Sequence, residues 1–166
     1  MRLLDLTSSV RRIVPALLLV LVGLGVTAPS PALADASDDP VASMGAATYE
    51  KRVQHWVNEM RDRRDLPALR VARCTDRVAE RWGRKLARTG QFYHQSMDTV
   101  LNRCDARYAG ETLGRGAMTP RHLVRLWMES DPHRVVLLSR NARRIGVGAV
   151  YDEHGRWVTA ANFMRF

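Results

Sequence analysis

Cysteine and lysine are both scarce in this chain of 166 residues. The two cysteines, Cys74 and Cys104, do not form a C-x-x-C pair, which excludes a thioredoxin-like redox motif and a structural zinc knuckle. In an oxidising compartment an even number of cysteines predicts a disulfide, and the alternative is two buried free thiols. A bridge that closes a loop of about 31 residues would contribute roughly 3–4 kcal/mol in the chain-entropy model.

Long apolar runs are absent from the sequence after residue 26, so no later segment is expected to span a bilayer. The one such run, residues 13–26, lies between three arginines and an Ala-Leu-Ala site. The flanking residues are Arg2, Arg11, Arg12 and Ala32-Leu33-Ala34. This order predicts a signal peptide over residues 1–34, and the alternatives are an uncleaved anchor and a loosely fitting twin-arginine signal. We therefore expect a secreted, extracellular protein.

Acidic side chains are outnumbered, 17 against 26 basic ones, which gives a net charge of +9. Residues 35–45 hold three aspartates among Ser and Pro without periodicity, which predicts a flexible linker. The remaining domain, residues 46–166, has 23 basic and 13 acidic side chains, and only Lys51 and Lys85 are lysines. A secreted basic domain is expected to meet anionic lipids, wall polymers or acidic glycans, and no nucleic acid.

One set of arginines follows helical spacing. Its members are Arg77, Arg81, Arg84 and Arg88, at i, i+4, i+7 and i+11. This spacing places them on one face of a helix. They form either a solvated face or an electrostatic patch that holds the domain against an anionic cell-envelope surface.

Hydrophobic periodicity predicts four helices. They cover residues 48–64, 75–89, a segment from Pro120, and a short segment from about 132 to 138. Thr75 and Thr119 are the expected N-caps of the second and third helices, and Gly90 ends the second. The short helix is expected to take its cap from Ser130 or Asp131.

The C-terminal part of the sequence reads as strands. Residues 144–151 and 157–164 flank a turn at 152–155 and predict a β-hairpin, and residues 108–113 predict a short edge strand. The glycines in Ile145-Gly146-Val147-Gly148 weaken a strand, so we expect another element to pack closely there. The whole predicts one α+β domain, an α-β-α sandwich with a small antiparallel sheet flanked by about four helices.

Short motifs stand in a fixed order along this domain. They are Asn58, Arg61, Leu66 and Leu69, then Trp82, Leu86, Gly90, Phe92 and His94, then Gly110-Glu111, Trp127-Met128, Pro132-His133-Arg134, Ile145-Gly146-Val147-Gly148 and Phe163. In this order they resemble a bacterial member of the CAP superfamily, named after cysteine-rich secretory proteins, antigen 5 and pathogenesis-related class 1 proteins, also called the SCP-like extracellular domain. The resemblance covers about residues 49–166. It implies a cavity built from His94, Glu111 and His133.

The sequence departs from the family pattern at three places. Thr112 stands where the family usually has Asn, so a local amide hydrogen bond is expected to be missing. Asp131-Pro132 replaces the usual Pro-Gly before His133. Ser130 holds the place where many eukaryotic members have a second cavity glutamate, and Glu129 is one residue off.

Two imidazoles and one carboxylate have the composition of a three-ligand zinc site with one open position. His94, Glu111 and His133 therefore form a candidate site for a divalent metal such as zinc. The alternative is a hydrogen-bonded polar cluster, in which Glu111 accepts from both histidines and raises their pKa values.

Three classes of function follow from these observations. The first is a monomeric, non-catalytic secreted domain that binds a small ligand, lipid, peptide or metal at the cell envelope. The second is a metal-assisted hydrolase that uses the same cavity, although the sequence has neither a G-x-S-x-G elbow nor an H-E-x-x-H motif. The third is a structural wall-associated protein with no cavity ligand. The sequence favours the first.

Overall fold

The computed structural model describes residues 43–166. The predicted signal peptide and nearly all of the predicted linker lie outside the described residues. In the described part, five helices and four strands follow one another. In chain order they are α1 (Ala46–Asp62), β1 (Arg70–Val71), α2 (Arg73–Thr89), α3 (Met97–Cys104), β2 (Tyr108–Gly116), α4 (Pro120–Glu129), α5 (Asp131–Leu137), β3 (Arg144–Tyr151) and β4 (Trp157–Arg165).

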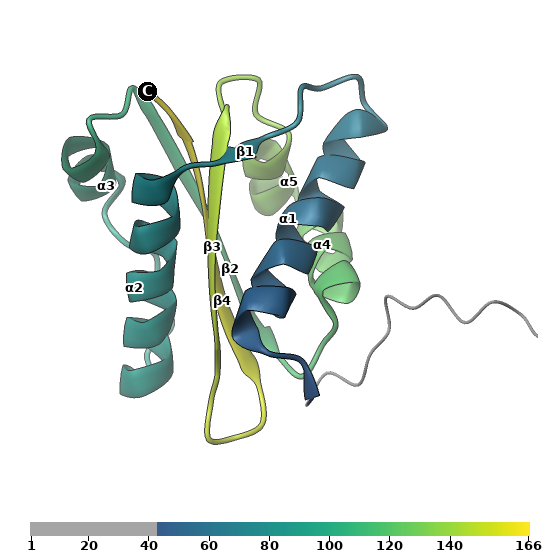
Figure 1. The fold of residues 1–166 in the computed structure, drawn as a ribbon, viewed down its shortest axis with the longest axis vertical. Coiled ribbons are helices and arrows are strands. Elements are labelled where there is room, and N and C mark those ends of the chain that lie inside the picture. The colour runs from purple at the N-terminus through teal and green to yellow at the C-terminus, as the bar shows by residue number, and fades with distance from the viewer. Residues whose placement is uncertain (1–42) are drawn as a thin grey trace, which may run out of the picture. The chain divides into compact units, whose positions relative to one another are not determined.

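The four strands form one sheet in the order β1-β3-β4-β2, with helices on both faces. Helices α2 and α3 cover one face, and α1, α4 and α5 cover the other (Figure 1). This arrangement confirms the predicted α+β sandwich and its β3–β4 hairpin. The sheet is mixed, because the two-residue strand β1 pairs with β3 in parallel. A fifth helix, α3, is also present, and the sequence did not reveal it because only Val100 of its eight residues is buried.

The helix boundaries follow capping chemistry at some ends and packing at others. The hydroxyl of Thr119 accepts a hydrogen bond from the backbone N–H of His122, with Pro120 in the first turn of α4, as predicted. Gly90 ends α2 in the left-handed conformation, at φ +68°. The predicted cap at Thr75 is wrong, because α2 begins two residues earlier and the buried Thr75 hydroxyl instead contacts Met164 Sδ at 3.4 Å.

Helix α2 packs directly on the backbone of β3, as the glycines of that strand predicted. A Cβ atom at Gly146 would lie 2.3 Å from the backbone N of Asp76. At Gly148 it would lie 2.3 Å from Cα of Glu80. These separations are far below van der Waals contact, so only glycine allows the helix to approach the strand this closely.

A disulfide joins Cys74, in the first turn of α2, to Cys104, at the end of α3. The predicted pairing is therefore confirmed. The bridge closes the segment that carries His94, so the two ends of that segment are tied together covalently. Within residues 43–166, no helix combines the length and the apolar character that a bilayer crossing requires.

Carboxylates close the open edge of β3. Strand β1 pairs only with residues 144 and 145, so among residues 43–166 the N–H groups farther along β3 have no strand partner on that side. The backbone N–H of Ala149 donates to Glu50 Oε1 at 2.9 Å, and that of Val147 donates to Asp76 Oδ1 at 3.4 Å. Burial, with smaller contributions from the nearby Glu80 and Asp76, raises the pKa of Glu50 to about 7, against the opposing effects of the bond from Ala149 and the charge of Arg84.

This carboxylate should make stability depend on pH. Glu50 has a folded-state pKa of about 7 against an ordinary 4.5, so between these values the folded protein holds a proton that the unfolded chain releases. Its stabilising contribution is complete below the unfolded pKa and is lost as the pH rises through about 7. Glu50→Gln should therefore flatten the decline of unfolding free energy between about pH 5 and pH 8, measured by urea titration.

Exposed Glu129 provides the matched control for that measurement, because its carboxylate has only a 3.7 Å pair with Arg125. Glu129→Gln should leave the decline unchanged. An equal decline in Glu50→Gln and the unmodified protein would contradict the assignment to Glu50.

Candidate functional site

Two of the three predicted site residues meet at the edge strand β2. Glu111 lies in β2, and the Nδ1 atom of His94 is 2.8 Å from Glu111 Oε1. The carboxylate side chain is only 1% exposed, whereas the His94 side chain is 57% exposed. Burial raises the pKa of Glu111, and the hydrogen bonds from Gln95 and His94 oppose that shift. A buried acceptor thus orients an imidazole that stays open to the surface.

Two amides that the sequence did not single out complete the surroundings of Glu111. Gln95 donates its backbone N–H to Oε1 at 3.2 Å and its side-chain amide to Oε2. The same amide donates to Asn162 Oδ1 at 3.2 Å, and Asn162 lies directly opposite Glu111 in β4. The sequence did contain a signal that could have pointed to Asn162, because it is the one amide side chain in a strand of mostly apolar, buried residues.

His133 approaches the cluster from α5, on the other helical layer. Gly110 of β2 packs against this helix, since a Cβ there would lie 3.0 Å from Val136 Cγ1. The Nδ1 atom of His133 is 2.9 Å from Ser130 Oγ. Ser130 occupies the N-cap position of α5 but makes no side-chain cap bond, so its hydroxyl holds the imidazole in place of a backbone N–H.

The prediction that Glu111 accepts from both histidines is wrong in part. Of the two histidines, His94 bonds to Glu111, whereas His133 bonds to Ser130. The pKa of His133 is lowered rather than raised, first by burial and then by the charge of His94. His133 is therefore neutral at pH 7, and the two imidazoles lie near enough to influence each other.

Besides Glu111, two side chains hold the loop that carries His94. Arg115, in β2, donates from Nη1 to the carbonyl of Gly90 at 3.2 Å and from Nη2 to that of Gln91 at 3.0 Å. Trp82 Nε1 donates to the carbonyl of Tyr93 at 3.1 Å. These bonds, together with the one from His94 to Glu111, connect the loop to both α2 and β2.

The fit of the site to a metal depends on which atoms remain available. Within residues 43–166, no three His, Cys, Asp or Glu side chains are grouped closely enough to hold an ion. Glu111 is nearly inaccessible and both of its oxygens accept hydrogen bonds, which favours an orienting role over direct ligation. The Nε2 atoms of His94 and His133 have no hydrogen bond within the described part. Metal binding by His94, Glu111 and His133 remains a prediction.

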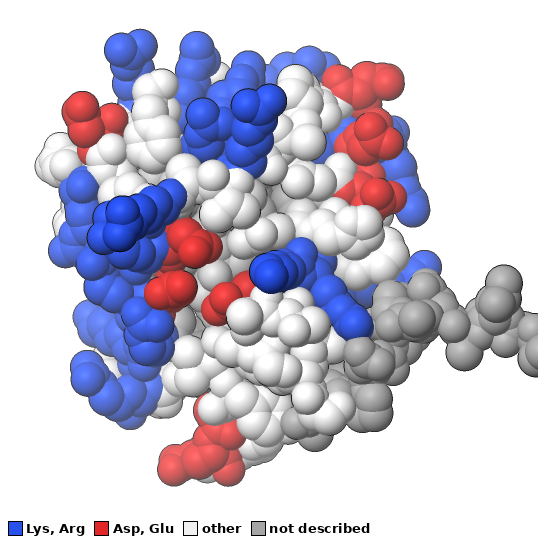
Figure 2. All heavy atoms as spheres, in the orientation of Figure 1, with Lys and Arg blue, Asp and Glu red and all other residues white. Residues whose placement is uncertain are grey.

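The predicted arginine patch lies on α2, the helix that precedes the loop carrying His94. Its four members are all exposed. Figure 2 shows basic side chains gathered along the flank that carries this helix. Arg84 pairs with Glu80 at 3.4 Å, and no salt bridge within residues 43–166 involves the other three.

Comparison with known sequences identifies the family. Residues 54–163 match the family model CAP, described as the cysteine-rich secretory protein family. The uncharacterized protein YkwD of Bacillus subtilis (strain 168) is 29% identical over 116 residues, which are 66% of this chain and 45% of that protein. The chain thus spans about half the length of this curated relative.

Two solved structures share the fold. An extracellular protein containing an SCP domain from Bacillus anthracis str. Ames aligns with a TM-score of 0.65 and 24% identity over 73% of this chain and 41% of its own. An outer surface protein from Borrelia burgdorferi aligns with a TM-score of 0.64 and 18% identity, over 69% of this chain and 90% of its own. With the family model matching most of the described residues, the chain belongs to the CAP, or cysteine-rich secretory protein, family.

Proposed function

We propose that this protein is a secreted, non-catalytic CAP domain that binds a labile divalent metal, such as zinc, through His94 and His133 at the cell envelope. The observation that carries the proposal is the 2.8 Å contact between His94 Nδ1 and the buried Glu111 carboxylate. A carboxylate on one ring nitrogen fixes the tautomer and strengthens the other nitrogen as a metal ligand. The 57% exposure of the His94 side chain leaves that nitrogen within reach of solvent.

His133 provides the second imidazole in this proposal. Its lowered pKa keeps it neutral at pH 7, which is the form that binds metals. Ser130 holds its Nδ1, so Nε2 is the nitrogen left for a ligand. Two protein ligands are fewer than the three or four of ordinary zinc sites, so binding should be weak and should leave positions for water or for a ligand molecule. A bound metal would supply Lewis acidity toward such a ligand.

A non-catalytic role fits the hydrogen-bonding pattern better than hydrolysis. The Ser130 hydroxyl and His133 are three residues apart in one helical turn and bond through Nδ1. Within residues 43–166, no carboxylate bonds to His133, so the pair lacks the orienting acid of a hydrolytic triad. Secretion rests on the signal-peptide pattern of residues 1–34 and on the secretory family to which the chain belongs.

Zinc titration by calorimetry tests the proposal. His94→Ala and His133→Ala should each weaken zinc binding at least about tenfold, and Glu111→Gln should weaken it about tenfold by releasing the His94 ring. His122→Ala, at an exposed site on α4, is the matched control and should bind as the unmodified protein does. Binding heat that persists in both cluster variants would place the metal elsewhere, and absence of heat in the unmodified protein would refute metal binding.

A further inference from the structure

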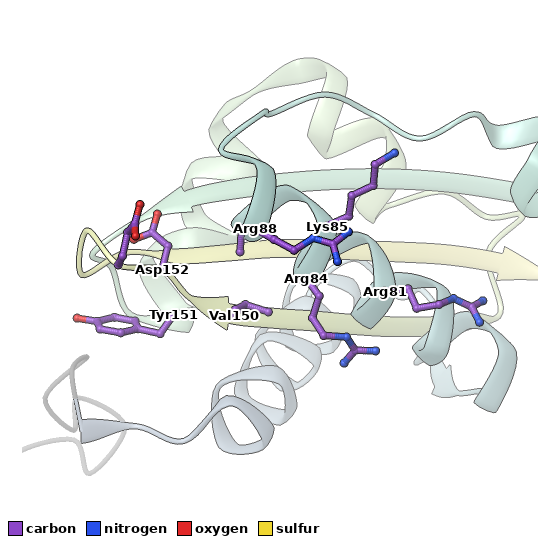
Figure 3. Close-up of a pocket in the computed structure, with 9 residues that line it drawn as sticks. Arg81, Arg84, Lys85, Arg88, Val150, Tyr151 and Asp152 are labelled. Carbon is purple, nitrogen blue, oxygen red and sulfur yellow. The ribbon is translucent and has the colours of Figure 1, made fainter.

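A hollow of about 700 Å³ lies between α2 and the turn that joins β3 to β4. Figure 3 shows Arg81, Arg84, Lys85 and Arg88 projecting from α2, with Tyr151 and Asp152 at the end of β3. Three of these basic residues belong to the stripe visible in the sequence. The fourth, Lys85, was not predicted to join them, and its Nζ lies 4.5 Å from the centre of the Trp82 ring.

A second hollow, of about 240 Å³, continues the first, since Arg88 and Asp152 line both. It adds two cations, Arg115, which lies in β2, and Arg156, which immediately precedes β4. We call the combined feature the basic trough and define it by Arg81, Arg84, Lys85, Arg88, Arg115 and Arg156. Its far end adjoins Gly90, where the loop that carries His94 begins.

The charges along the trough are poorly neutralised by the protein. Within the described residues, neither Arg81 nor Arg88 forms a salt bridge, and Arg84 has only its exposed pair with Glu80. Of the two carboxylates in the wall, Asp152 is held by Arg156, which donates from Nε at 3.0 Å and from Nη2 at 2.9 Å. The free guanidinium groups therefore have their binding capacity available for an external anion.

We propose that the basic trough binds a linear, phosphate-bearing polyanion of the cell envelope. The cations follow one another along the helix, and Arg81 to Arg88 spans about 10 Å at 1.5 Å per residue. This length suits a chain with repeated negative groups better than a single small anion. Guanidinium forks match phosphate oxygens geometrically, and nearly all the cations of the trough are arginines.

A single polymer strand also fits the trough better than a bilayer does. The cations line an open hollow beside α2, which a strand can follow along its length. Glu153 lines both hollows with its side chain 88% exposed, so an anionic membrane laid across them would meet this carboxylate. Apart from Arg115, which also holds the loop that carries His94, the residues of the trough take no part in the proposed histidine site.

The test uses long-chain inorganic polyphosphate as the probe and compares two double variants of the same charge. Arg81→Ala with Arg88→Ala removes two unpaired cations from the trough. Arg63→Ala with Arg140→Ala removes two exposed cations that lie outside it. The trough variant should bind polyphosphate roughly three- to tenfold more weakly. The slope of the logarithm of its binding constant against the logarithm of salt concentration should be less steep by about one to two units. The control variant should lose much less.

Further arms of the experiment separate the outcomes. Inorganic phosphate at equal total phosphate should compete poorly, and equal competition would overturn the polymer in favour of a single-anion site. If both double variants lost the same amount of polyphosphate affinity, the effect would depend on net charge alone, and the proposal would be overturned. Loss of binding to phosphatidylglycerol vesicles without loss of polyphosphate binding would assign the trough to a membrane instead. His94→Ala should bind polyphosphate normally, so failure of the metal site and failure of the trough are distinguishable.

Discussion

Replacing Arg61 by methionine should lower the free energy of unfolding by about 3–4 kcal/mol. Arg61 lies on the last turn of α1 and is fully buried. Its Nη1 donates to the carbonyls of Leu137 at 2.8 Å and Ser139 at 3.0 Å, and its Nε donates to that of Pro67 at 3.0 Å. Methionine fills a similar volume but leaves these three acceptors without their donor.

The size of this effect follows from opposing contributions. Leaving the buried carbonyl of Leu137 unsatisfied costs about 1–3 kcal/mol, and the part-buried carbonyls of Pro67 and Ser139 add less each. Removal of the buried charge offsets part of this loss, because its desolvation cost disappears. Burial is also the main cause that lowers the pKa of Arg61, with a smaller contribution from the charge of Arg143. Arg61→Lys should recover only a fraction of the stability, because an ammonium cannot reproduce the planar fork.

Urea unfolding monitored by circular dichroism measures this change. Exposed Arg63, two residues along the chain, provides the control, and Arg63→Met should change stability by less than about 0.5 kcal/mol. Leu137 ends α5, the helix that carries His133, so Arg61→Met should also weaken zinc binding. If the Arg61→Met variant were as stable as the unmodified protein, these three hydrogen bonds would make no net contribution to the free energy of unfolding.

Replacing Gly148 by alanine should cost about 3 kcal/mol, because the added methyl group would collide with a helix backbone. Its Cβ would lie 2.3 Å from Cα and 2.4 Å from N of Glu80. Neither atom belongs to a side chain that can rotate away, so α2 must shift on the sheet. Such a shift would also disturb the disulfide and the basic trough, which both depend on α2.

Two further glycines set a scale for this prediction. A Cβ at Gly83 would lie 2.9 Å from the carbonyl oxygen of Gly148, so Gly83→Ala should destabilise less than Gly148→Ala. A Cβ at Gly45 would have no neighbour within 4 Å, so Gly45→Ala should change stability by less than about 1 kcal/mol. Thermal unfolding of the three variants should give this order. A Gly148→Ala protein as stable as Gly45→Ala would contradict the close packing of α2 on β3.

Local sequence signals were sufficient for the elements themselves. The apolar spacing of Tyr49, Val53 and Val57 predicted α1, and Thr119-Pro120 predicted the start of α4. The hairpin followed from two strand-like runs around a short turn. These predictions succeeded because periodicity and capping act over a few residues. Helix α3 was missed because it buries too little to show an apolar period.

The partners within the site could not be predicted in this way. Gln95 reaches Glu111 and Asn162 only because β2 pairs with β4 in a particular register. The bond of His133 to Ser130 rather than to Glu111 depends on where α5 lies relative to β2. Both contacts depend on how segments that are far apart in the chain pack against one another.

The family resemblance, the helix and hairpin pattern, the cysteine pairing and the candidate histidines and glutamate were all predictable from residue order and spacing. The burial of Glu111 behind His94, and the extension of the helical arginine stripe into a trough by Arg115 and Arg156, became evident only from the packing of the layers. Spacing along the chain places residues on a common helix face, because that geometry repeats every few residues. Contacts between layers depend on which backbones can approach, and here the glycines of β3 allow α2 to pack directly on the sheet.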